Sequence, residues 1–526
     1  MKTLWHNGTM YTMEQEGDQV EALLTENGKI SAVGTFEDLK ERADNEIDLQ
    51  GSVLYPGFVD SHMHMIGHGE KLLSLDLSKA SSADDMMDML MNAYPDLKSD
   101  EWFIGEGWNE NNFPDKKIPT RHELDKVTDS PMLLKRTCRH AALANSKALE
   151  LAGISKDTLD PEDGVIMRDA NGEPTGYLKE GAQKIVLGLI PEPTEESLTL
   201  ALRKSVDDLL SLGLTGGVTD DLGYYGDYKN PLQAFKNVIG EQKKFRAHLL
   251  RRSTVFKQLM EEQATYNEPW IEPGEMKFFI DGALGGKTAL LSKPYADTPE
   301  TSGMAVITDE EIDMLVAHAR KYGEAIAVHV IGDAAVEKAL NAIEKYPVPS
   351  GKRDRLIHVN VLREDLVKRM EKLPVILDLQ PVFVSSDFPW VMERLGEDRL
   401  DWAYAWKKLL DRGFICGGGS DAPIEEVDPL LGIYAAAARR KPGENHEGYL
   451  PDEKLSRYEA VGLFTTGSAG TIGKADVRGK LIPGFDADFT VLDRDLFQVT
   501  DEEIVNATVV MTVVAGEVMY RGDEHV

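Results

Sequence analysis

The middle of the chain alternates strands with helices, and this alternation constrains the fold more than any other feature of the sequence. Parallel strands joined by helical crossovers give exactly this repeating pattern. After a first strand that ends near residue 64, the apolar runs predict strands at 213–219, 245–250, 276–280, 325–330, 355–359, 375–379 and 414–419. Helices such as 309–322 and 333–345 lie between several of them. Eight parallel strands close most economically into a (β/α)8 TIM-type barrel, an α/β fold whose active site lies at the carboxyl ends of the strands. A doubly wound open sheet is the alternative.

Both ends of the chain have a different pattern, with short strands separated by turns. Asn27-Gly28 between two apolar runs is a strong hairpin signal, and residues 488–520 repeat the same alternation of strands and turns. We therefore expect residues 1–55 and 475–526 to form one small composite β-sandwich domain. The barrel is expected to take up 56–474, with a long insertion at about 70–205. Insertions of this kind commonly shape or cover the site.

Composition restricts the compartment and the partners. The net charge is 58 − 90 = −32 with histidines neutral, which argues against nucleic acid and against anionic membrane surfaces as partners. Two cysteines in 526 residues suit a reducing compartment, and the first residues lack the apolar stretch of a signal peptide. The sequence predicts a cytoplasmic protein with a small-molecule substrate. Dimers are the commonest soluble assembly, so a homodimer stays open.

Histidine, lysine and aspartate residues occupy five of the predicted barrel strands. His62 and His64 stand two residues apart at the end of an apolar run, and in a strand such side chains share one face. Two histidines on one face form half of a metal site. The remaining candidates come from strands four, five, six and eight: Lys277, His329, His358 and Asp421. Because all of these strands end at one rim of a barrel, the joint pattern predicts a metal site there.

Each of these residues also has a purely structural interpretation. The later histidines could be core side chains with satisfied hydrogen bonds. Asp421 could cap the start of a helix. Lys277 could form a buried ion pair with Asp281 or Asp220.

The same residues resemble the amidohydrolase superfamily over nearly the whole chain. The resemblance rests on Gly57-Phe58-Val59-Asp60-Ser61-His62-Met63-His64, on the strand-four lysine, on the two later histidines and on Ser420-Asp421-Ala422-Pro423. Within the superfamily, a branch that includes N-substituted formamide deformylases and YtcJ-like proteins is similar at 107–109, 139–146 and 277–285. This branch is functionally diverse, so the resemblance specifies the superfamily rather than one substrate.

The resemblance implies a ligand set and a mechanism. One or two divalent metal ions are expected. Zinc is the first expectation, although imidazole and carboxylate ligands also accept manganese, iron and cobalt. His62, His64 and Asp421 would hold one ion and His329 and His358 the other, with an N-carboxylated Lys277 and a hydroxide between them. In a mononuclear enzyme the ligands would be His62, His64, His329 and Asp421, without a carbamate.

The expected function is hydrolysis of a C–N bond in an amide, formamide or cyclic amide. A metal-bound hydroxide would attack the carbonyl, Asp421 would act as proton shuttle, and the second metal or His329 would polarise the carbonyl. Two alternatives stay open: a deaminase or an ester or phosphoester hydrolase on the same barrel, and a non-catalytic small-molecule binding protein.

The insertion is expected to supply specificity. Trp108, Arg139 and His140 lie in segments that resemble the family, and we predict that they bind substrate. Residues 435–447, which follow the eighth strand, are expected to form a loop over the mouth of the barrel.

Overall fold

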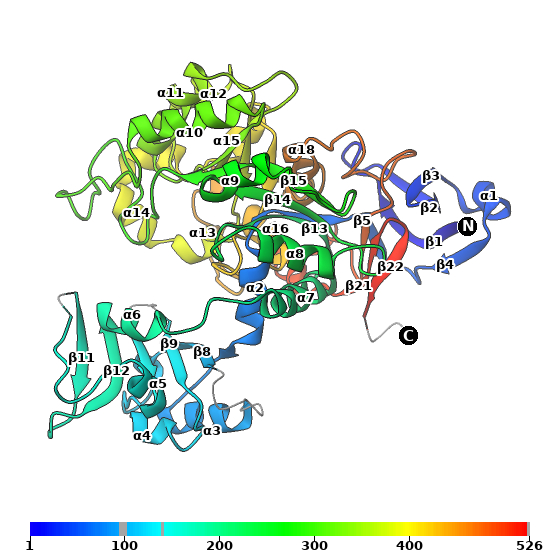
Figure 1. The fold of residues 1–526 in the computed structure, drawn as a ribbon. Coiled ribbons are helices and arrows are strands. Elements are labelled where there is room, and N and C mark those ends of the chain that lie inside the picture. Colours follow the sequence, from blue (N-terminus) through cyan, green and yellow to red (C-terminus); the bar gives the residue numbers. More distant parts are fainter. Residues whose placement is uncertain (94–101, 138–140, 162, 523–526) are drawn as a thin grey trace. The chain divides into compact units, whose positions relative to one another are not determined.

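The computed structural model describes residues 1–93, 102–137, 141–161 and 163–522 (Figure 1). The chain forms two compact units. One comprises residues 1–68 and 195–526, and the other comprises residues 69–194. Among the described residues, no helix is both long and apolar enough to cross a membrane.

The larger unit contains an eight-stranded, all-parallel sheet whose strands follow one another in chain order. In sequence these are β6 (Phe58–Met63), β13 (Leu214–Leu222), β14 (Arg246–Arg252), β15 (Ile271–Phe279), β16 (Ile326–Val330), β17 (Asp354–His358), β18 (Val375–Leu379) and β19 (Cys416–Gly418). Two backbone hydrogen bonds link the C-terminal end of β6 to the residues that follow β19. The N–H of Asp421 donates to His62 O at 2.8 Å, and the N–H of His64 donates to Ala422 O at 2.7 Å. These bonds join the last strand to the first, so the predicted (β/α)8 barrel is confirmed.

Helices lie between most of the barrel strands, as parallel pairing requires. Helix α10 (Asp309–Lys321) shows how the sequence sets their ends. Thr308 and Glu311 form a reciprocal capping box at its start, with acidic residues in the first turn and basic residues in the last. Ile312, Val316 and Ala319 form its buried face. The other helices of this unit are α1 (Phe36–Leu39), α2 (Met65–Leu73, which runs across the boundary of the two units), α7 (Glu195–Ser211), α8 (Lys229–Val238), α9 (Ser253–Glu261), α11 (Asp333–Lys345), α12 (Glu364–Met370), α13 (Phe383–Asp387), α14 (Trp390–Leu395), α15 (Trp406–Asp411), α16 (Pro429–Ala438), α17 (Arg457–Gly462), α18 (Ser468–Thr471) and α19 (Asp501–Ile504).

A second sheet combines strands from both ends of the chain. Its order is β22-β21-β20-β5-β1-β2-β3, with β4 paired to β1, so the blue and red strands of Figure 1 belong to one sheet. Trp5, Leu54 and Phe489 are among the buried residues of its largest apolar cluster. Whether residues 1–55 and 475–526 are a domain distinct from the barrel stays a prediction. The strands are β1 (Lys2–Tyr11), β2 (Gln19–Glu26), β3 (Lys29–Gly34), β4 (Asn45–Asp48), β5 (Val53–Pro56), β20 (Phe489–Leu492), β21 (Val509–Val514) and β22 (Glu517–Arg521).

Gly57 separates this terminal sheet from the barrel. A Cβ at this position would lie 2.4 Å from Thr215 Oγ1 in β13, so only glycine permits the backbone between β5 and β6 to approach β13 this closely. The Thr215 hydroxyl uses the same proximity to donate to Phe58 O at 3.1 Å. The first barrel strand therefore begins at Phe58, and Leu54 belongs to β5 of the terminal sheet.

In its described residues, the smaller unit contains a six-stranded sheet, four α-helices and a short 3-10 helix, Glu110–Asn112. Its strands, in the order β11-β12-β10-β9-β8-β7, are β7 (Leu75–Asp76), β8 (Phe103–Trp108), β9 (Met132–Arg136), β10 (Ala141–Ala144), β11 (Gly164–Arg168) and β12 (Pro174–Glu180). Its helices are α3 (Ala83–Ala93), α4 (Arg121–Leu124), α5 (Ser146–Leu151) and α6 (Gly181–Leu187). Two apolar clusters form its core.

Candidate metal centre and active-site cavity

The barrel brings its candidate ligands to one end of the sheet. All belong to the larger unit and lie in or just past the carboxyl-terminal parts of their strands. His62 lies in β6 and His64 follows that strand, Lys277 lies in β15, His329 in β16, His358 ends β17, and Asp421 follows β19.

His62, His64 and Asp421 form the tightest group. The Nε2 atoms of His62 and His64 lie 3.5 and 3.4 Å from the same atom, Asp421 Oδ1. One potential ligand atom from each residue lies within 4.8 Å of those of the other two, a spacing that could hold a metal ion. The group unites the first and the last strand of the barrel.

The other two histidines continue this group into a chain of neighbouring imidazoles. The ring centroids of His62 and His358 are 5.6 Å apart, and those of His358 and His329 are 4.6 Å apart. Four imidazoles and one carboxylate thus converge, a donor set typical of transition-metal sites.

Hydrogen bonds fix the ring orientation of three of these histidines, including His329, whose Nε2 lies 3.0 Å from Gly282 O. His64 Nδ1 lies 3.0 Å from the backbone oxygen of Asp220, and His358 Nδ1 lies 2.8 Å from Gln380 Oε1. Since Asp220 O and Gln380 Oε1 are acceptors, Nδ1 carries a proton in His64 and His358, and Nε2 is the nitrogen left to face a metal ion. The Nε2 atom of His358 is buried and has no hydrogen-bond partner among the described residues. A metal ion would satisfy this nitrogen.

Burial keeps most of these imidazoles neutral, the form that binds metals. Burial and the neighbouring cationic groups hold the pKa values of His62 and His329 well below the usual range, and burial lowers the pKa of His358 to about 4. His64 differs, because Asp421 outweighs burial and raises its pKa to about 8. Burial alone would raise the pKa of Asp421, but contact with His64 holds it below its usual value.

Lys277 is completely buried beside the histidines. Its Nζ lies 3.4 Å from His62 Nε2 and 4.7 Å from the centroid of the Phe279 ring. Burial lowers the pKa of this amine to about 8. Lys277 forms no ion pair with any carboxylate in the part of the chain that the structure describes, so the interpretation as an ion pair with Asp281 or Asp220 is wrong.

Asp281 instead holds backbone together. Its carboxylate accepts from the backbone N–H groups of Leu290, Ile331 and Gly332 at 2.9 to 3.0 Å. It therefore shapes the segment after β15 and the end of β16 rather than serving as a counter-ion.

Asp60 is a functional residue that we did not predict from the sequence. One of its oxygens accepts from the backbone N–H of His62 at 2.9 Å, and the other accepts from the N–H and the hydroxyl of Ser420 at 3.0 and 2.7 Å. This carboxylate positions the ligand-bearing ends of β6 and β19 relative to one another. Its place in the same motif, two residues before His62, was the available signal.

A cavity of about 350 Å³ opens over the centre, and all of its lining residues belong to the larger unit. Residues 435–447 contribute no lining residue among those described, and that they cover the mouth stays a prediction. The lining residues other than the candidate ligands are mostly apolar or aromatic, with a few polar groups: Tyr224, Phe279, Ala283, Leu284, Gly285, Ile331, Asn360, Phe383, Asp387, Ile424 and Glu425.

The residues of the insertion that were predicted to bind substrate do not line this cavity among the described residues. Trp108 is fully buried in the core of the smaller unit, and its Nε1 donates to Leu134 O at 2.9 Å. Its binding role stays a prediction, because a side chain without exposed surface could contact a ligand only if that core repacked. Arg139 and His140 lie outside the described residues.

A barrel with a histidine and carboxylate centre at its carboxyl rim defines a class, the metal-dependent hydrolases with TIM-type barrels. The sequence model of the amidohydrolase family matches residues 45–520, and the chain belongs to this family.

Individual relatives agree with this assignment. The chain is 48% identical over 528 residues to the putative amidohydrolase YtcJ of Bacillus subtilis (strain 168), covering 99% of this chain and 100% of YtcJ. It is 26% identical to the N-substituted formamide deformylase of Arthrobacter pascens, covering 98% and 97% of the two chains. The crystal structure of an uncharacterised metal-dependent hydrolase from Pyrococcus furiosus is similar with a TM-score of 0.80 and 30% identity, covering 95% of this chain and 100% of that one.

Proposed function

We propose that this metal-dependent hydrolase cleaves a C–N bond in an amide, formamide or cyclic amide. The observation that carries the proposal is the convergence of four imidazoles with the carboxylate of Asp421 at one end of the barrel. The similarity to a formamide deformylase supports the choice of a C–N bond, although at 26% identity it does not specify the substrate.

The residues fit one or two divalent metal ions. The orphaned Nε2 of His358 and the shared position of His62, His64 and Asp421 call for a cation among them. His62, His64 and Asp421 would hold one ion and His329 and His358 the other, with zinc as the first expectation because neutral imidazoles suit it. When bound, the metal supplies Lewis acidity and makes water a nucleophile at neutral pH.

Asp421 is proposed as the group that moves the proton. Its lowered pKa keeps it ionised at neutral pH, so it can accept a proton from the attacking water. It can then deliver this proton to the leaving nitrogen, which an amide requires because an amide anion leaves poorly. The apolar lining of the cavity, including Phe279 and Phe383, excludes bulk water around the reacting carbonyl.

We further propose that Lys277 is N-carboxylated and bridges two metal ions. Its completely buried side chain and the lowered pKa of its amine support this assignment, because only the neutral amine reacts with carbon dioxide. We also propose that the protein is cytoplasmic, acts on a small molecule and has no nucleic-acid or membrane partner. A homodimer stays open.

A substrate panel tests the reaction class. The purified protein, loaded in turn with zinc, manganese and cobalt, is assayed on N-formyl amines, simple amides, cyclic amides, aminopurines, carboxylic esters and phosphoesters. We expect metal-dependent turnover with at least one C–N substrate and faster turnover of that substrate than of the ester with the same acyl group. Turnover of aminopurines or esters alone would favour the alternative activities and reject this one.

A further inference from the structure

One part of the cavity wall carries a hydrogen-bonded chain of three side chains away from the metal centre. Asn360 and Asp387 line the cavity, and Tyr404, which is fully buried, joins them. Asn360 Nδ2 lies 3.1 Å from the Tyr404 hydroxyl, which in turn donates to Asp387 Oδ2. None of the three belongs to the candidate ligand set.

The chemistry of these groups fixes the direction of the chain. The Tyr404 hydroxyl has a single proton, and this proton is donated to Asp387 Oδ2. The hydroxyl oxygen must then accept from Asn360, which requires the amide nitrogen of Asn360 to face Tyr404. The amide oxygen of Asn360 is thereby left on the other side.

Two acceptor atoms remain without a partner at this place. Asn360 is only 3% exposed and lines the cavity, yet its Oδ1 makes no hydrogen bond within the described part of the chain. Asp387 Oδ1 likewise has no hydrogen bond or ion pair among the described residues. Neither oxygen is completely buried, and both residues line the cavity, so a ligand there that donates hydrogen bonds can reach these acceptors.

The charges around Asp387 favour a cationic donor. Burial and the charge of Glu425, another lining residue, together raise the pKa of this carboxyl to about 7, against the opposing effect of the hydrogen bond from Tyr404. Arg394 is the cation that opposes Glu425, but its guanidinium donates to the backbone oxygens of Leu284 and Gly285 and stacks 4.4 Å from the Trp390 ring centroid. A cation on the ligand would balance the charge of Asp387.

Aromatic surface connects this wall to the metal centre. Phe383, in the helix that Asp387 ends, lines the cavity and stacks on His358 with ring centroids 5.9 Å apart. A flat or aliphatic group can therefore pack between the reacting bond and the acceptor pair.

We propose that Asn360 and Asp387 form a subsite for a primary ammonium or amino group, so that the preferred substrate carries an amine in addition to its scissile bond. The inference rests on the proposed function only for the identity of that bond. The subsite itself concerns binding and can be tested without turnover.

Binding of a matched pair of ligands to metal-stripped protein tests the subsite. Phenethylamine and 2-phenylethanol have the same shape, and removing the metal prevents the amine from binding to it. Calorimetric titration is expected to give roughly 10- to 100-fold tighter binding of the amine, in line with hydrogen bonds to charged groups. Equal affinity of the two ligands for the wild-type protein would overturn the proposal.

Variants test which residue causes the tighter binding of the amine. Asp387→Asn should abolish the difference in affinity between phenethylamine and 2-phenylethanol. Asp398→Asn, which changes an exposed aspartate paired with Lys293, should leave this difference unchanged. Retention of the preference in Asp387→Asn would contradict the assignment.

A second variant guards against misfolding of Asp387→Asn. Ile424 lines the cavity and is 57% exposed, so a longer polar side chain is tolerated there. Ile424→Lys should weaken binding of the amine by charge repulsion but not binding of the alcohol, and Ile424→Gln should change neither. An equal effect of Ile424→Lys on both ligands would count against the subsite. If the protein hydrolyses amides but binds the amine and the alcohol equally, only the subsite is rejected. If it binds the amine more tightly but hydrolyses no amide, only the proposed function is rejected.

Discussion

Asp421 has an unusual local structure for an aspartate near a helix. Its backbone lies in the left-handed region at φ 58°, and the next helix, α16, begins only at Pro429 with Asp428 as its N-cap. The interpretation of Asp421 as a helix cap is therefore wrong. A strained backbone at a residue that contacts two histidines suggests that the position is kept for its chemistry.

Asp421→Asn keeps the shape of the side chain and removes its basicity. We expect kcat for the C–N substrate to fall by about 10² to 10⁴, the range of general acid–base contributions. The matched control is Asp428→Asn, because asparagine caps a helix about as well as aspartate and turnover should stay within a few-fold of wild type. Steady-state kinetics measures kcat for both variants, on metal-loaded samples whose metal content has been determined. Near-normal kcat in Asp421→Asn would eliminate the proton-shuttle role.

Lys277→Ala tests the proposed carbamate. The variant should lose at least one equivalent of metal and most of its turnover, and short carboxylic acids such as acetate or propionate should restore part of both by replacing the missing bridge. Elemental analysis and kinetics with and without acid measure this. Lys277→Met, whose side chain fills more of the same space, controls for the cavity left by alanine and should not be rescued. A Lys277→Ala variant that keeps two metals and ignores added acid would reject the bridge.

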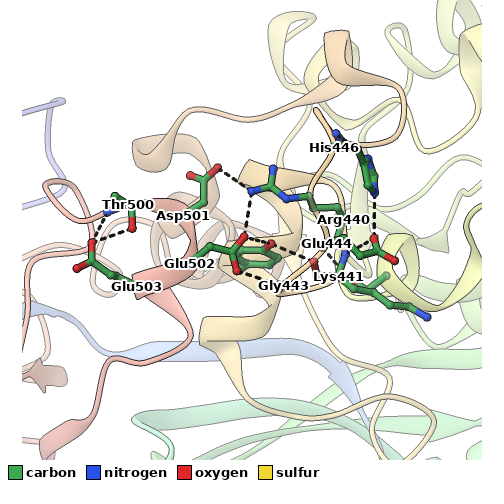
Figure 2. A network of polar contacts seen from close by, with 12 residues as sticks. Arg440, Lys441, Gly443, Glu444, His446, Thr500, Asp501, Glu502 and Glu503 are labelled. Atoms are coloured by element: carbon green, nitrogen blue, oxygen red, sulfur yellow. Dashed lines mark hydrogen bonds and ion pairs between the residues drawn. The ribbon is translucent and has the colours of Figure 1, made fainter.

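At the scale of elements, the segment after α16 is fastened to the short helix α19. Figure 2 shows Glu502 of α19 at the centre of this contact. One of its oxygens accepts from the Tyr434 hydroxyl at 2.9 Å and from Arg440 Nη2 at 3.0 Å, and the other accepts from the backbone N–H of Gly443 at 3.0 Å. The segment that we expected over the barrel mouth is therefore anchored to the C-terminal part of the chain.

Glu502→Ala should release this segment. All three hydrogen bonds are lost, but the side chain is 45% exposed, so we expect a global destabilisation of only about 1 kcal/mol. Local opening should be larger and visible as faster tryptic cleavage after Arg440 and Lys441. Glu503→Ala is the control, because among the described residues its carboxylate accepts only from Thr500, the N-cap of the same helix (Figure 2). Equal cleavage rates in the two variants would mean that Glu502 does not hold the segment.

The limits of prediction from sequence are clear in strand β15. We expected this strand at 276–280, but it begins at Ile271 and includes Pro273 and Gly274, two residue types that are uncommon inside strands. Gly274 is needed there, since a Cβ would lie 2.7 Å from His248 Nε2, and its carbonyl accepts from Arg251 Nε at 2.6 Å. A close approach between neighbouring strands is invisible in the sequence of either one.

Some residues of the candidate site could be predicted from the sequence and others could not. The histidines, Lys277 and Asp421 could be predicted because each occupies a strand with a clear apolar pattern and because strand ends meet in a barrel. The chain from Asn360 through Tyr404 to Asp387 could not, since its members come from different loops and helices that only tertiary structure brings together. The role of Asp60 depends in the same way on Ser420, which is far away in the sequence.

At the scale of the whole molecule, metal binding should contribute to the stability of the larger unit. A ligand that binds only the folded state adds about 3 to 4 kcal/mol at 100 to 1,000 times its Kd. Chelation is therefore expected to lower the Tm by several degrees, and adding the metal back should reverse the change. Differential scanning calorimetry checks this.

A variant separates the site from general effects of the chelator. The double substitution His62→Ala, His64→Ala removes two ligands, so it should retain little metal by elemental analysis and its Tm should not respond to chelator. Full metal content in the double variant would reject the ligand assignment. An unchanged Tm on chelation of the metal-loaded wild-type protein would instead show that the ions do not stabilise the fold.

The hydrogen bonds between Asp421 and His62, and between His64 and Ala422, join the ends of the barrel at the very residues that would bind the metal. Nearly the whole barrel sequence lies between these two points. During synthesis, a nascent chain that has not yet emerged from the ribosome beyond Ala422 has neither a closed barrel nor a complete ligand set. The complete ligand set therefore forms only late in synthesis, so an ion that requires all of these ligands would bind a barrel whose strands have all been made.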